Sequence, residues 1–363
     1  MSKVVVFGGT FDPPHIGHEH LLESVMQKGA FDKAIIVPTL HPVHKSRTVE
    51  LSFEIRCDML RQLFYNMPGI EICDIENDST VKHYTFDTLE KLGILYPNDT
   101  LYLLMGSDMF LTLEQWYKFD KLLEKYHIIT AARNNDDVKR INEYLNKLKA
   151  KYKCCSITIY ELPILAVSST DLRNTVVTKI IEYNKANLKP SRYKHVLRVA
   201  GYALYLAYIY SLPLDKAYIA ALSHDCTKCW DDQKQLAYFE LNDIILSEDE
   251  LNSPKIYHQI SGAHFAKNHF NIDDIDILNS IRYHTTGRRQ MSMLEKVTFL
   301  ADTLEPARDF AGIGQMRKAA ISDIDFAMYL TLKRQISYIK ERGLNMNLQT
   351  LRAYEQYAER IEK

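Results

Sequence analysis

The chain has 363 residues, of which 46% are hydrophobic and 25% charged, so it is longer than one typical domain and has enough apolar side chains for folded cores. Its net charge of −1 gives no electrostatic footprint for duplex nucleic acid. No apolar run approaches the roughly 18 residues that a membrane span needs, and Met1 is not followed by a signal peptide. We therefore expect a cytoplasmic protein of two domains without nucleic-acid or membrane partners, and homo-oligomerisation stays open.

The six cysteines stand at irregular spacing, and nothing else in the chain suggests export, so we expect thiols. Cys226 and Cys229 form a Cys-x-x-Cys pair, but no second pair stands at the spacing of a zinc site. We interpret these two, and the adjacent Cys154 and Cys155, as structural.

The first half alternates apolar β-branched runs with helical patterns, which predicts an α/β domain with a Rossmann-like parallel sheet. The expected strands cover residues 4–7, 33–37, 70–75, 100–105, 127–132 and 157–162.

The second half, from about Ser191, shows helical periodicity, as in residues 196–210 and 272–283, and predicts an all-α bundle. A polar stretch before it ends in Pro190, which fits a short linker. We therefore place the first domain at 1–185, a linker at 186–190 and the second domain at 191–363.

One segment near the start of the chain reads V-V-V-F-G-G-T-F-D-P-P-H-I-G-H and joins a buried strand, a glycine turn and a helix start. Gly8 and Gly9 let the backbone approach a ligand closely, and Pro14 suits a first helical turn. His15 and His18 lie on one helix face, where the free N–H groups and the positive end of the helix dipole attract an anion. This segment predicts a phosphate site.

In an open parallel sheet, ligands bind beyond the carboxyl ends of the strands. Distinctive residues follow the expected strands there: Lys45, Gly106, Asp108, Arg133, Ser168, Ser169, Thr170 and Arg173. A hydroxyl side chain of Ser168, Ser169 or Thr170 can cap a helix while Arg173 reaches a phosphate. Their joint placement on one edge of one sheet predicts a nucleotide site.

The His15-x-Gly-His18 motif resembles that of the nucleotidyltransferase superfamily, and residues 1 to about 185 most resemble the nicotinate mononucleotide adenylyltransferases within it. Besides this motif, the resemblance rests on His44-Lys45, Tyr84-Thr85-Phe86-Asp87-Thr88-Leu89, Gly106-Ser107-Asp108 with Trp116-Tyr117, and Ser168-Ser169-Thr170 with Arg173. It implies adenylyl transfer from ATP to nicotinate mononucleotide, which gives deamido-NAD and pyrophosphate, with Mg²⁺ bridging the triphosphate.

The resemblance also implies roles for single residues. His15, His18, Lys45 and Arg173 would stabilise charge during in-line attack. ATP would contact Gly8, Gly9, Thr10, Phe11, His15, His18, Gly106, Asp108, Ser168, Ser169, Thr170 and Arg173. Nicotinate mononucleotide would contact Lys45, Thr85, Trp116 and Arg133, with the electron-poor pyridinium stacked on the indole.

Two loops depart from the family pattern. Val43 stands where the family has a second proline, and Asn134 and Asn135 stand where it has proline and glycine. Both loops lie near the mononucleotide phosphate, so the preference for acid or amide stays open. Another phosphate acceptor, such as phosphopantetheine, is the alternative, which Trp116 and Thr85 disfavour. Class I tRNA synthetases carry a similar motif, but no Lys-Met-Ser-Lys-Ser segment follows here.

The second half carries histidines and aspartates that are spread over several expected helices: His195, His224, Asp225, His258, His284 and Asp302. Such sets commonly hold two first-row metals in a helical bundle. A lone His-Asp pair is usually only a salt bridge, but this order resembles the HD superfamily of metal-dependent phosphohydrolases.

Further segments resemble the bacterial HD proteins that hydrolyse diadenosine tetraphosphate to two ADP. They are Ser191-Arg192-Tyr193-Lys194-His195, His224-Asp225 with Lys228, Ile281 to Arg288, Met291-Ser292, and Leu300 to Arg308. The resemblance covers Ser191 to about Ala320 and implies activity on dinucleoside polyphosphates.

This resemblance implies two metal sites. One would use His195, His224, Asp225 and Asp302, and His258 and His284 would complete the other, with Asp225 bridging. Lys228, Arg288 and Arg308 would clamp phosphates. Iron is our first choice because mixed histidine and carboxylate sites with open positions suit it, and manganese is second. The metal would supply a hydroxide nucleophile, which makes Asp225 part of the catalytic set. The alternative is a sensor or dimerisation module, against which the complete ligand set argues.

Overall fold

The computed structural model describes residues 1–40, 49–132, 135–152, 156–162, 167–172, 174–343 and 345–361. The chain forms two compact units, Met1–Ser169 and Thr170–Lys363. In the described residues, we find no helix with the length and apolar character that a membrane crossing requires.

The first unit is built on a six-stranded parallel sheet with the strand order β3-β2-β1-β4-β5-β6. The strands are β1 (Lys3–Gly9), β2 (Lys33–Pro38), β3 (Ile70–Ile72), β4 (Thr100–Gly106), β5 (His127–Ala132) and β6 (Ser156–Glu161). All six expected strands are therefore confirmed, although β3 is shorter than expected, since it leaves the sheet after Cys73 donates a last hydrogen bond to Ile36. The strand order reverses between β1 and β4, where such sheets bind nucleotides.

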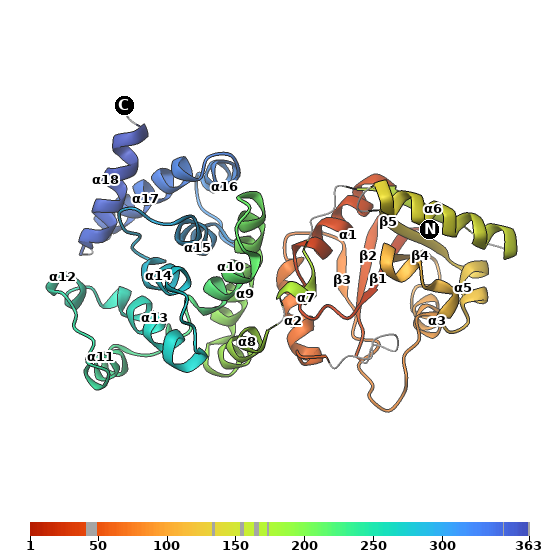
Figure 1. Ribbon diagram of the computed structural model, residues 1–363, viewed down its shortest axis with the longest axis horizontal. Coiled ribbons are helices and arrows are strands. Elements are labelled where there is room, and N and C mark those ends of the chain that lie inside the picture. Colours follow the sequence, from red (N-terminus) through yellow and green to blue (C-terminus); the bar gives the residue numbers. More distant parts are fainter. Residues whose placement is uncertain are drawn as a thin grey trace. The chain divides into compact units, whose positions relative to one another are not determined.

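Helices cover both faces of this sheet (Figure 1). Val5 and Phe7 of β1 face α1 (Ile16–Gly29) and α2 (Phe53–Leu63), whereas Val4 and Val6 face the cluster that includes α3 (Thr85–Leu95), α5 (Phe119–Lys125) and α6 (Asn135–Lys151). Because both faces are buried, the strand has a continuous apolar sequence. The short elements are α4 (Ser107–Phe110), η1 (Leu113–Gln115) and α7 (Ser169–Leu172).

The second unit contains only helices among its described residues, which confirms the expected all-α fold. They are α8 (Thr175–Asn187), α9 (Pro190–Ile209), α10 (Leu214–Ser223), α11 (Asp232–Leu241), α12 (Glu248–Leu251), η2 (Pro254–Ile256), α13 (Tyr257–Phe270), α14 (Ile275–Tyr283), α15 (Met293–Leu304), α16 (Ile313–Ser322), α17 (Ile324–Glu341) and α18 (Leu348–Ile361). Helix α9 packs against α10 and α15, and α14 packs between α13 and α15.

The two units divide earlier in the sequence than the polar stretch before Pro190 indicates. Helix α8 belongs to the second unit because it packs against α10 and α13, and the buried Asn184 donates to the carbonyl of Leu222 at 2.7 Å. Pro190 is the first residue of α9, where its fixed φ and missing N–H suit a helix start. The domain limits at 185 and 191 stay predictions, while compactness divides the chain after Ser169.

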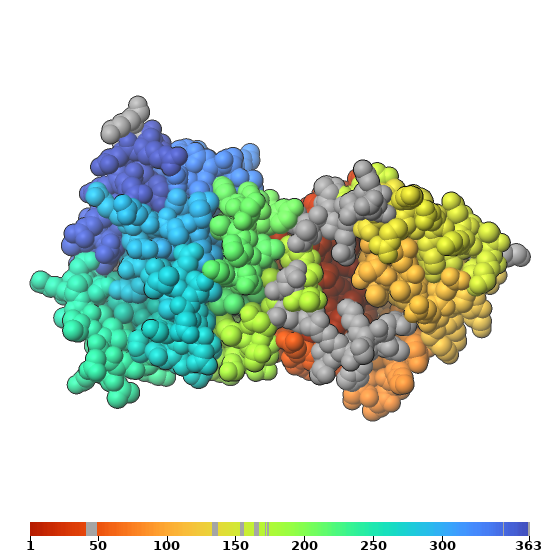
Figure 2. Space-filling view, in the orientation of Figure 1, coloured from red at the N-terminus to blue at the C-terminus, as the bar shows by residue number. Residues whose placement is uncertain are grey.

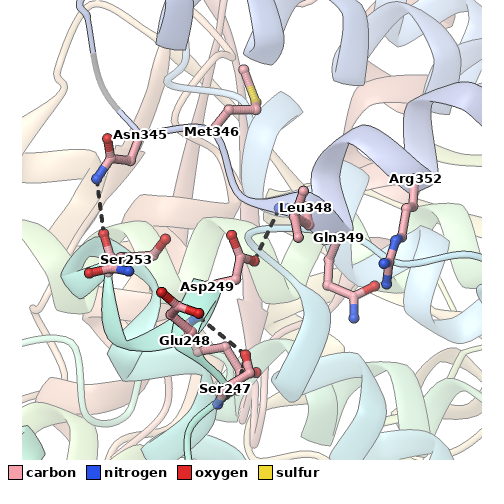
Figure 3. Close-up of a pocket in the computed structure, with 11 residues that line it drawn as sticks. Ser247, Glu248, Asp249, Ser253, Asn345, Met346, Leu348, Gln349 and Arg352 are labelled. Carbon is pink, nitrogen blue, oxygen red and sulfur yellow. Dashed lines mark hydrogen bonds between the residues drawn. The ribbon is translucent and has the colours of Figure 1, made fainter.

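A cleft of about 740 Å³ lies in the second unit between residues 247–253 and 345–352 (Figure 3). Asp249 lies inside it and accepts hydrogen bonds from the backbone N–H of Leu348 at 3.1 Å and from Asn347 Nδ2 at 2.7 Å. These bonds tie α12 to the start of α18. None of the predicted ligand residues lines this cleft.

The cysteines Cys57, Cys73, Cys226 and Cys229 are thiols, as expected. Cys154 and Cys155 lie outside the described residues.

A buried arginine joins the loops at the carboxyl ends of β1 and β2. Arg56 is only 1% exposed; its Nη1 donates to the carbonyls of Thr10 at 2.5 Å and Thr39 at 2.8 Å, and its Nε donates to that of Leu51 at 3.2 Å. Burial lowers the pKa of Arg56, and the nearby Asp12 carboxylate opposes this shift. The sequence reasoning missed this residue, which holds the nucleotide edge of the sheet together.

We predict that Arg56→Met lowers the free energy of unfolding of the first unit by about 3 kcal/mol, because three carbonyls lose a buried charged donor. Arg61→Met is the matched control on the same helix, since Arg61 is 50% exposed and pairs only with Asp58; it should cost less than about 0.5 kcal/mol. Calorimetry of the full chain measures both variants. Equal losses would contradict a special role for Arg56.

Candidate active sites

The histidine pair of the first unit lies at the start of α1. His15 is the N-cap residue, so Pro14, expected in the first helical turn, stands just outside the helix. Nδ1 of His15 accepts a hydrogen bond from the N–H of Gly17, and Nδ1 of His18 accepts one from the N–H of His15, both at 3.2 Å. A neutral imidazole that accepts at Nδ1 carries its proton on Nε2. The two rings, whose centroids are 3.8 Å apart, therefore present Nε2–H donors that suit an anion.

Glycine is required at two positions of this motif. A Cβ on Gly17 would lie 3.0 Å from Nδ1 of His15, so a side chain there would displace the ring. A Cβ on Gly9 would lie 2.8 Å from the ring of Phe11. Gly8 differs, because an added Cβ meets no described atom within 4 Å, which is consistent with close approach of a ligand.

The ends of β6 and β4 reach the same edge of the sheet. Ser169 Oγ donates to the carbonyl of Pro13 at 2.8 Å, so Ser169 lies beside the histidine motif. Strand β4, which pairs with β1, ends at Gly106, where an added Cβ would lie 2.7 Å from Oδ1 of Asp108. On the face shown, Figure 2 reveals a hollow in the first unit with the red N-terminal residues at its floor. Lys45, Arg133 and Arg173 lie outside the described residues.

Two segments predicted to enclose the pyridine ring lie side by side. The rings of Tyr84 and Tyr117 are tilted against each other by 33°, with centroids 4.4 Å apart. Thr85 is the first residue of α3, and Trp116 ends η1 and packs partly against the sheet core. The structure thus brings Thr85 and Trp116 onto neighbouring segments, as a shared ligand requires.

The second unit gathers the six predicted metal ligands. His195 lies in α9, His258 in α13 and Asp302 in α15, while His224 and His284 are the C-cap residues of α10 and α14, and Asp225 follows His224. Two groups have ligand atoms that all lie within 4.8 Å of one another: His195, His224 and Asp302, and His224, Asp225 and His284.

Asp225 lies close to three histidines of the cluster. Its Oδ1 lies 3.4 Å from Nε2 of His258 and 3.6 Å from Nε2 of His284. Its Oδ2 lies 3.4 Å from Nε2 of His224 and accepts a hydrogen bond of 2.8 Å from Arg192. Because the two oxygens face different histidines, the carboxylate is placed as a bridge would be.

The hydrogen bonds of two histidines suit metal binding. Nδ1 of His224 donates to the carbonyl of Ala221 at 2.6 Å, and Nδ1 of His284 donates to that of Ile281 at 2.7 Å. Each Nε2 therefore keeps its lone pair. Nε2 of His224 and Oδ1 of Asp225 are buried and have no hydrogen-bond partner in the described part of the chain. Buried acceptors without partners are costly, and a cation would satisfy them, so these residues fit a metal centre.

The surroundings of Asp225, His258 and His284 favour the ligand forms of these three residues. Although burial raises the pKa of Asp225, His224, His284 and Lys228 together bring it well below its usual range. Burial lowers the pKa of His258 and of His284, and Lys228 lowers that of His258 further. The aspartate is thus a carboxylate, and these two imidazoles are neutral.

The three predicted phosphate clamps differ in their surroundings. Lys228 Nζ lies 3.0 Å from Nε2 of His258, within the cluster. Arg308 is 43% exposed and reaches Oδ1 of Asp302 at 3.5 Å. The guanidinium of Arg288 instead makes two hydrogen bonds, of 2.7 and 2.6 Å, with the buried carboxylate of Glu295.

Two residues at the cluster had no role in the sequence reasoning. Arg192 contacts Asp225, and the buried Glu305 lies 3.1 Å from Nδ1 of His195. Arg192 precedes His195 by three residues, and Glu305 follows Asp302 by three, which is the spacing that places residues on one helix face. That spacing is the signal by which they could have been found.

Both halves of the chain are similar to known proteins. Residues 6–175 match the family described as cytidylyltransferase-like, and residues 192–307 match the HD domain family. A probable nicotinate-nucleotide adenylyltransferase/Ap4A hydrolase of Mycoplasma genitalium is 28% identical over 94% of this chain and 99% of that protein.

Two shorter relatives are more similar in sequence. A probable nicotinate-nucleotide adenylyltransferase of Carboxydothermus hydrogenoformans is 32% identical over 49% of this chain and 88% of that protein. A symmetrical bis(5'-nucleosyl)-tetraphosphatase of Halalkalibacterium halodurans is 35% identical over 49% of this chain and 95% of that protein. The HD domain match at residues 192–307 lies in the second half of the chain. The chain therefore belongs to two families joined in one polypeptide, the nicotinate-nucleotide adenylyltransferases and the symmetrical bis(5'-nucleosyl)-tetraphosphatases.

Proposed function

We propose that the chain is a bifunctional enzyme. Its first unit transfers the adenylyl group of ATP to nicotinate mononucleotide and forms deamido-NAD and pyrophosphate, and its second unit hydrolyses diadenosine tetraphosphate to two ADP. The observation that carries the proposal is that two sets of histidines differ in which ring nitrogen carries the proton. His15 and His18 present N–H donors, whereas His224 and His284 present lone pairs.

In the first unit, the mononucleotide phosphate attacks the α-phosphorus of ATP in line, and pyrophosphate leaves. Catalysis then consists of alignment and stabilisation of charge on the phosphate oxygens. His15, His18 and the N-terminus of α1 supply hydrogen-bond donors for those oxygens. We assign the same task to Lys45 and Arg173. Bound Mg²⁺ would neutralise part of the triphosphate charge.

The mononucleotide is held at the segments that carry Thr85 and Trp116. An electron-poor pyridinium stacks favourably on an electron-rich indole face, so Trp116 is assigned to the ring. Arg133 and Lys45 are assigned to the mononucleotide phosphate. Gly106 and Asp108, at the end of β4, are assigned to ATP, with Asp108 holding a ribose or orienting the loop.

In the second unit, we assign His195, His224 and Asp302 to one metal, His258 and His284 to another, and Asp225 to both. Iron is proposed because mixed histidine and carboxylate sites with open positions suit it, with manganese as second choice. When bound, the two ions would supply Lewis acidity and a hydroxide nucleophile at neutral pH. Lys228 and Arg308 lie at the cluster and are assigned to the negative charge of the polyphosphate. Water adds across the central phosphoanhydride, so that two ADP result.

We predict that His18→Ala lowers the rate of deamido-NAD formation on the order of 10²-fold or more, because a donor to the developing charge is lost. Hydrolysis of diadenosine tetraphosphate should stay near the wild-type rate, since that site lies in the other unit. His20→Ala, on the same helix and outside the motif, is the control. A His18→Ala enzyme that turns over ATP and nicotinate mononucleotide at the normal rate would contradict the role assigned to His18.

Substitution of Trp116 by alanine should raise KM for nicotinate mononucleotide about tenfold and leave KM for ATP nearly unchanged, because stacking acts on the pyridine ring alone. Initial rates with one substrate varied at a time give both constants. If both constants rise equally, Trp116 is a packing residue whose loss loosens the whole unit.

Asp225→Asn should empty both metal sites and abolish hydrolysis, whereas His258→Ala should empty only one site. Elemental analysis of protein purified without chelators measures the metal content per chain. The exposed Asp273→Asn variant serves as control. An Asp225→Asn protein with full metal content and full hydrolysis would reduce the cluster to a structural ion-pair network.

A further inference from the structure

His195 differs from His224 and His284 in how its ring is held. His224 and His284 are C-cap residues, and each donates from Nδ1 to a backbone carbonyl three residues earlier in its helix. Such carbonyls are open to a side chain because the helix ends there. His195 instead lies well inside α9, where the backbone carbonyls are used by the helix itself. Its Nδ1 therefore needs an acceptor from another element.

Glu305 supplies that acceptor. Its Oε1 lies 3.1 Å from Nδ1 of His195, while Nε2 on the opposite side of the ring lies 2.9 Å from Oδ1 of Asp302. The ring is thus held between a carboxylate outside the predicted ligand set and one inside it. With Nδ1 donating to Glu305, Nε2 is the nitrogen that faces the site shared with Asp302 and His224 and would offer its lone pair to a metal there.

The Glu305 carboxylate is itself fixed in place. It is 2% exposed, and its Oε2 accepts hydrogen bonds from Nε of Arg198 at 2.8 Å and from the N–H of Ala307 at 2.7 Å. Arg317 binds the backbone carbonyl of Glu305 at 2.7 Å. A buried carboxylate held from several directions has no freedom to turn towards a ligand of its own. Its Oε1 faces Nδ1 of His195 and is also contacted by Nη2 of Arg198 at 3.3 Å and by Nε of Arg308 at 3.9 Å.

We propose that Glu305 is a positioning residue of the metal centre, which fixes the orientation and protonation of His195 and so strengthens the metal site formed with His224 and Asp302. The proposal rests on the metal-dependent hydrolysis proposed above. Carboxylates that accept the second N–H of a ligand histidine orient the ring and raise its basicity, and their loss typically weakens metal affinity 10- to 100-fold.

Glu305→Gln tests this proposal in the full chain through the binding of Co²⁺, followed by its visible absorption and by competition with a chelator. We expect one of two Co²⁺ ions to bind 10- to 100-fold more weakly while the other keeps its affinity. Glu295→Gln is the matched control, because Glu295 is also a buried carboxylate of α15 but pairs with Arg288 and contacts no cluster histidine. It should leave both Co²⁺ affinities unchanged.

Glu305→Asp covers the case in which the glutamine variant does not fold. It keeps a negative charge beside Arg198 but is too short to reach His195, so weaker binding of one Co²⁺ is again expected. Unchanged affinity for both ions in a folded Glu305 variant, together with a lower melting temperature of the metal-free protein, would overturn the proposal and leave Glu305 as a counterion of Arg198.

Failure of the proposed function gives a different result. If the wild-type chain binds two Co²⁺ and Glu305→Gln weakens one, but no preparation loaded with Co²⁺, iron or manganese hydrolyses diadenosine tetraphosphate, the positioning role stands and the hydrolase function falls. If the wild type hydrolyses this substrate and Glu305→Gln changes no metal affinity, the hydrolase function stands and the positioning role falls.

Discussion

A neutral imidazole can donate from only one of its two nitrogens, and in this protein the ends of helices decide which one. At the start of α1, backbone N–H groups donate to Nδ1 of His15 and His18, so Nε2 carries the proton. At the ends of α10 and α14, carbonyls accept from Nδ1 of His224 and His284, so Nε2 is left with its lone pair. The same side chain is thereby prepared for an anion in one unit and for a cation in the other.

Each unit supports its histidines by burying charge beside them. In the first unit, the buried Arg56 and Asp12 make hydrogen bonds that join the loops following β1 and β2. These bonds fix the edge of the sheet around the histidine motif. In the second, Asp225 has one oxygen facing His258 and His284 and the other facing His224. Buried charges are costly without partners: Arg56 and Asp12 find theirs in backbone groups, whereas the arrangement around Asp225 favours a cation.

Much of the fold and of both sites follows from the sequence because their signals are local. The β-branched run before Gly8 predicts a buried strand, and β1 is buried on both faces. In the structure, His15 and His18 lie at the start of α1, and the six HD residues lie together in the second unit. The assignment of the pyridine ring to Trp116 comes from resemblance, since a tryptophan alone does not distinguish a stacking residue from a core residue.

Other features depend on contacts between distant residues and leave little trace in the sequence. The linker at 186–190 stays a prediction, but the polar sequence before it did not indicate that Asn184 is buried and donates to the carbonyl of Leu222, or that Pro190 begins a helix. Arg56 had no signal, because a single arginine in a helical pattern usually lies on the surface. The assignment of Arg288 to phosphate stays a prediction; what the sequence did not indicate is that its guanidinium binds Glu295.

The protonation of the histidines can be measured directly. Two-bond ¹H–¹⁵N spectra of the metal-free chain with ¹⁵N-labelled histidine, recorded at about pH 8, where imidazoles are ordinarily neutral, distinguish the two forms once single His→Gln variants assign the signals. The account predicts protonated Nε2 in His15 and His18 and protonated Nδ1 in His224 and His284. The same protonated nitrogen in both pairs would contradict it.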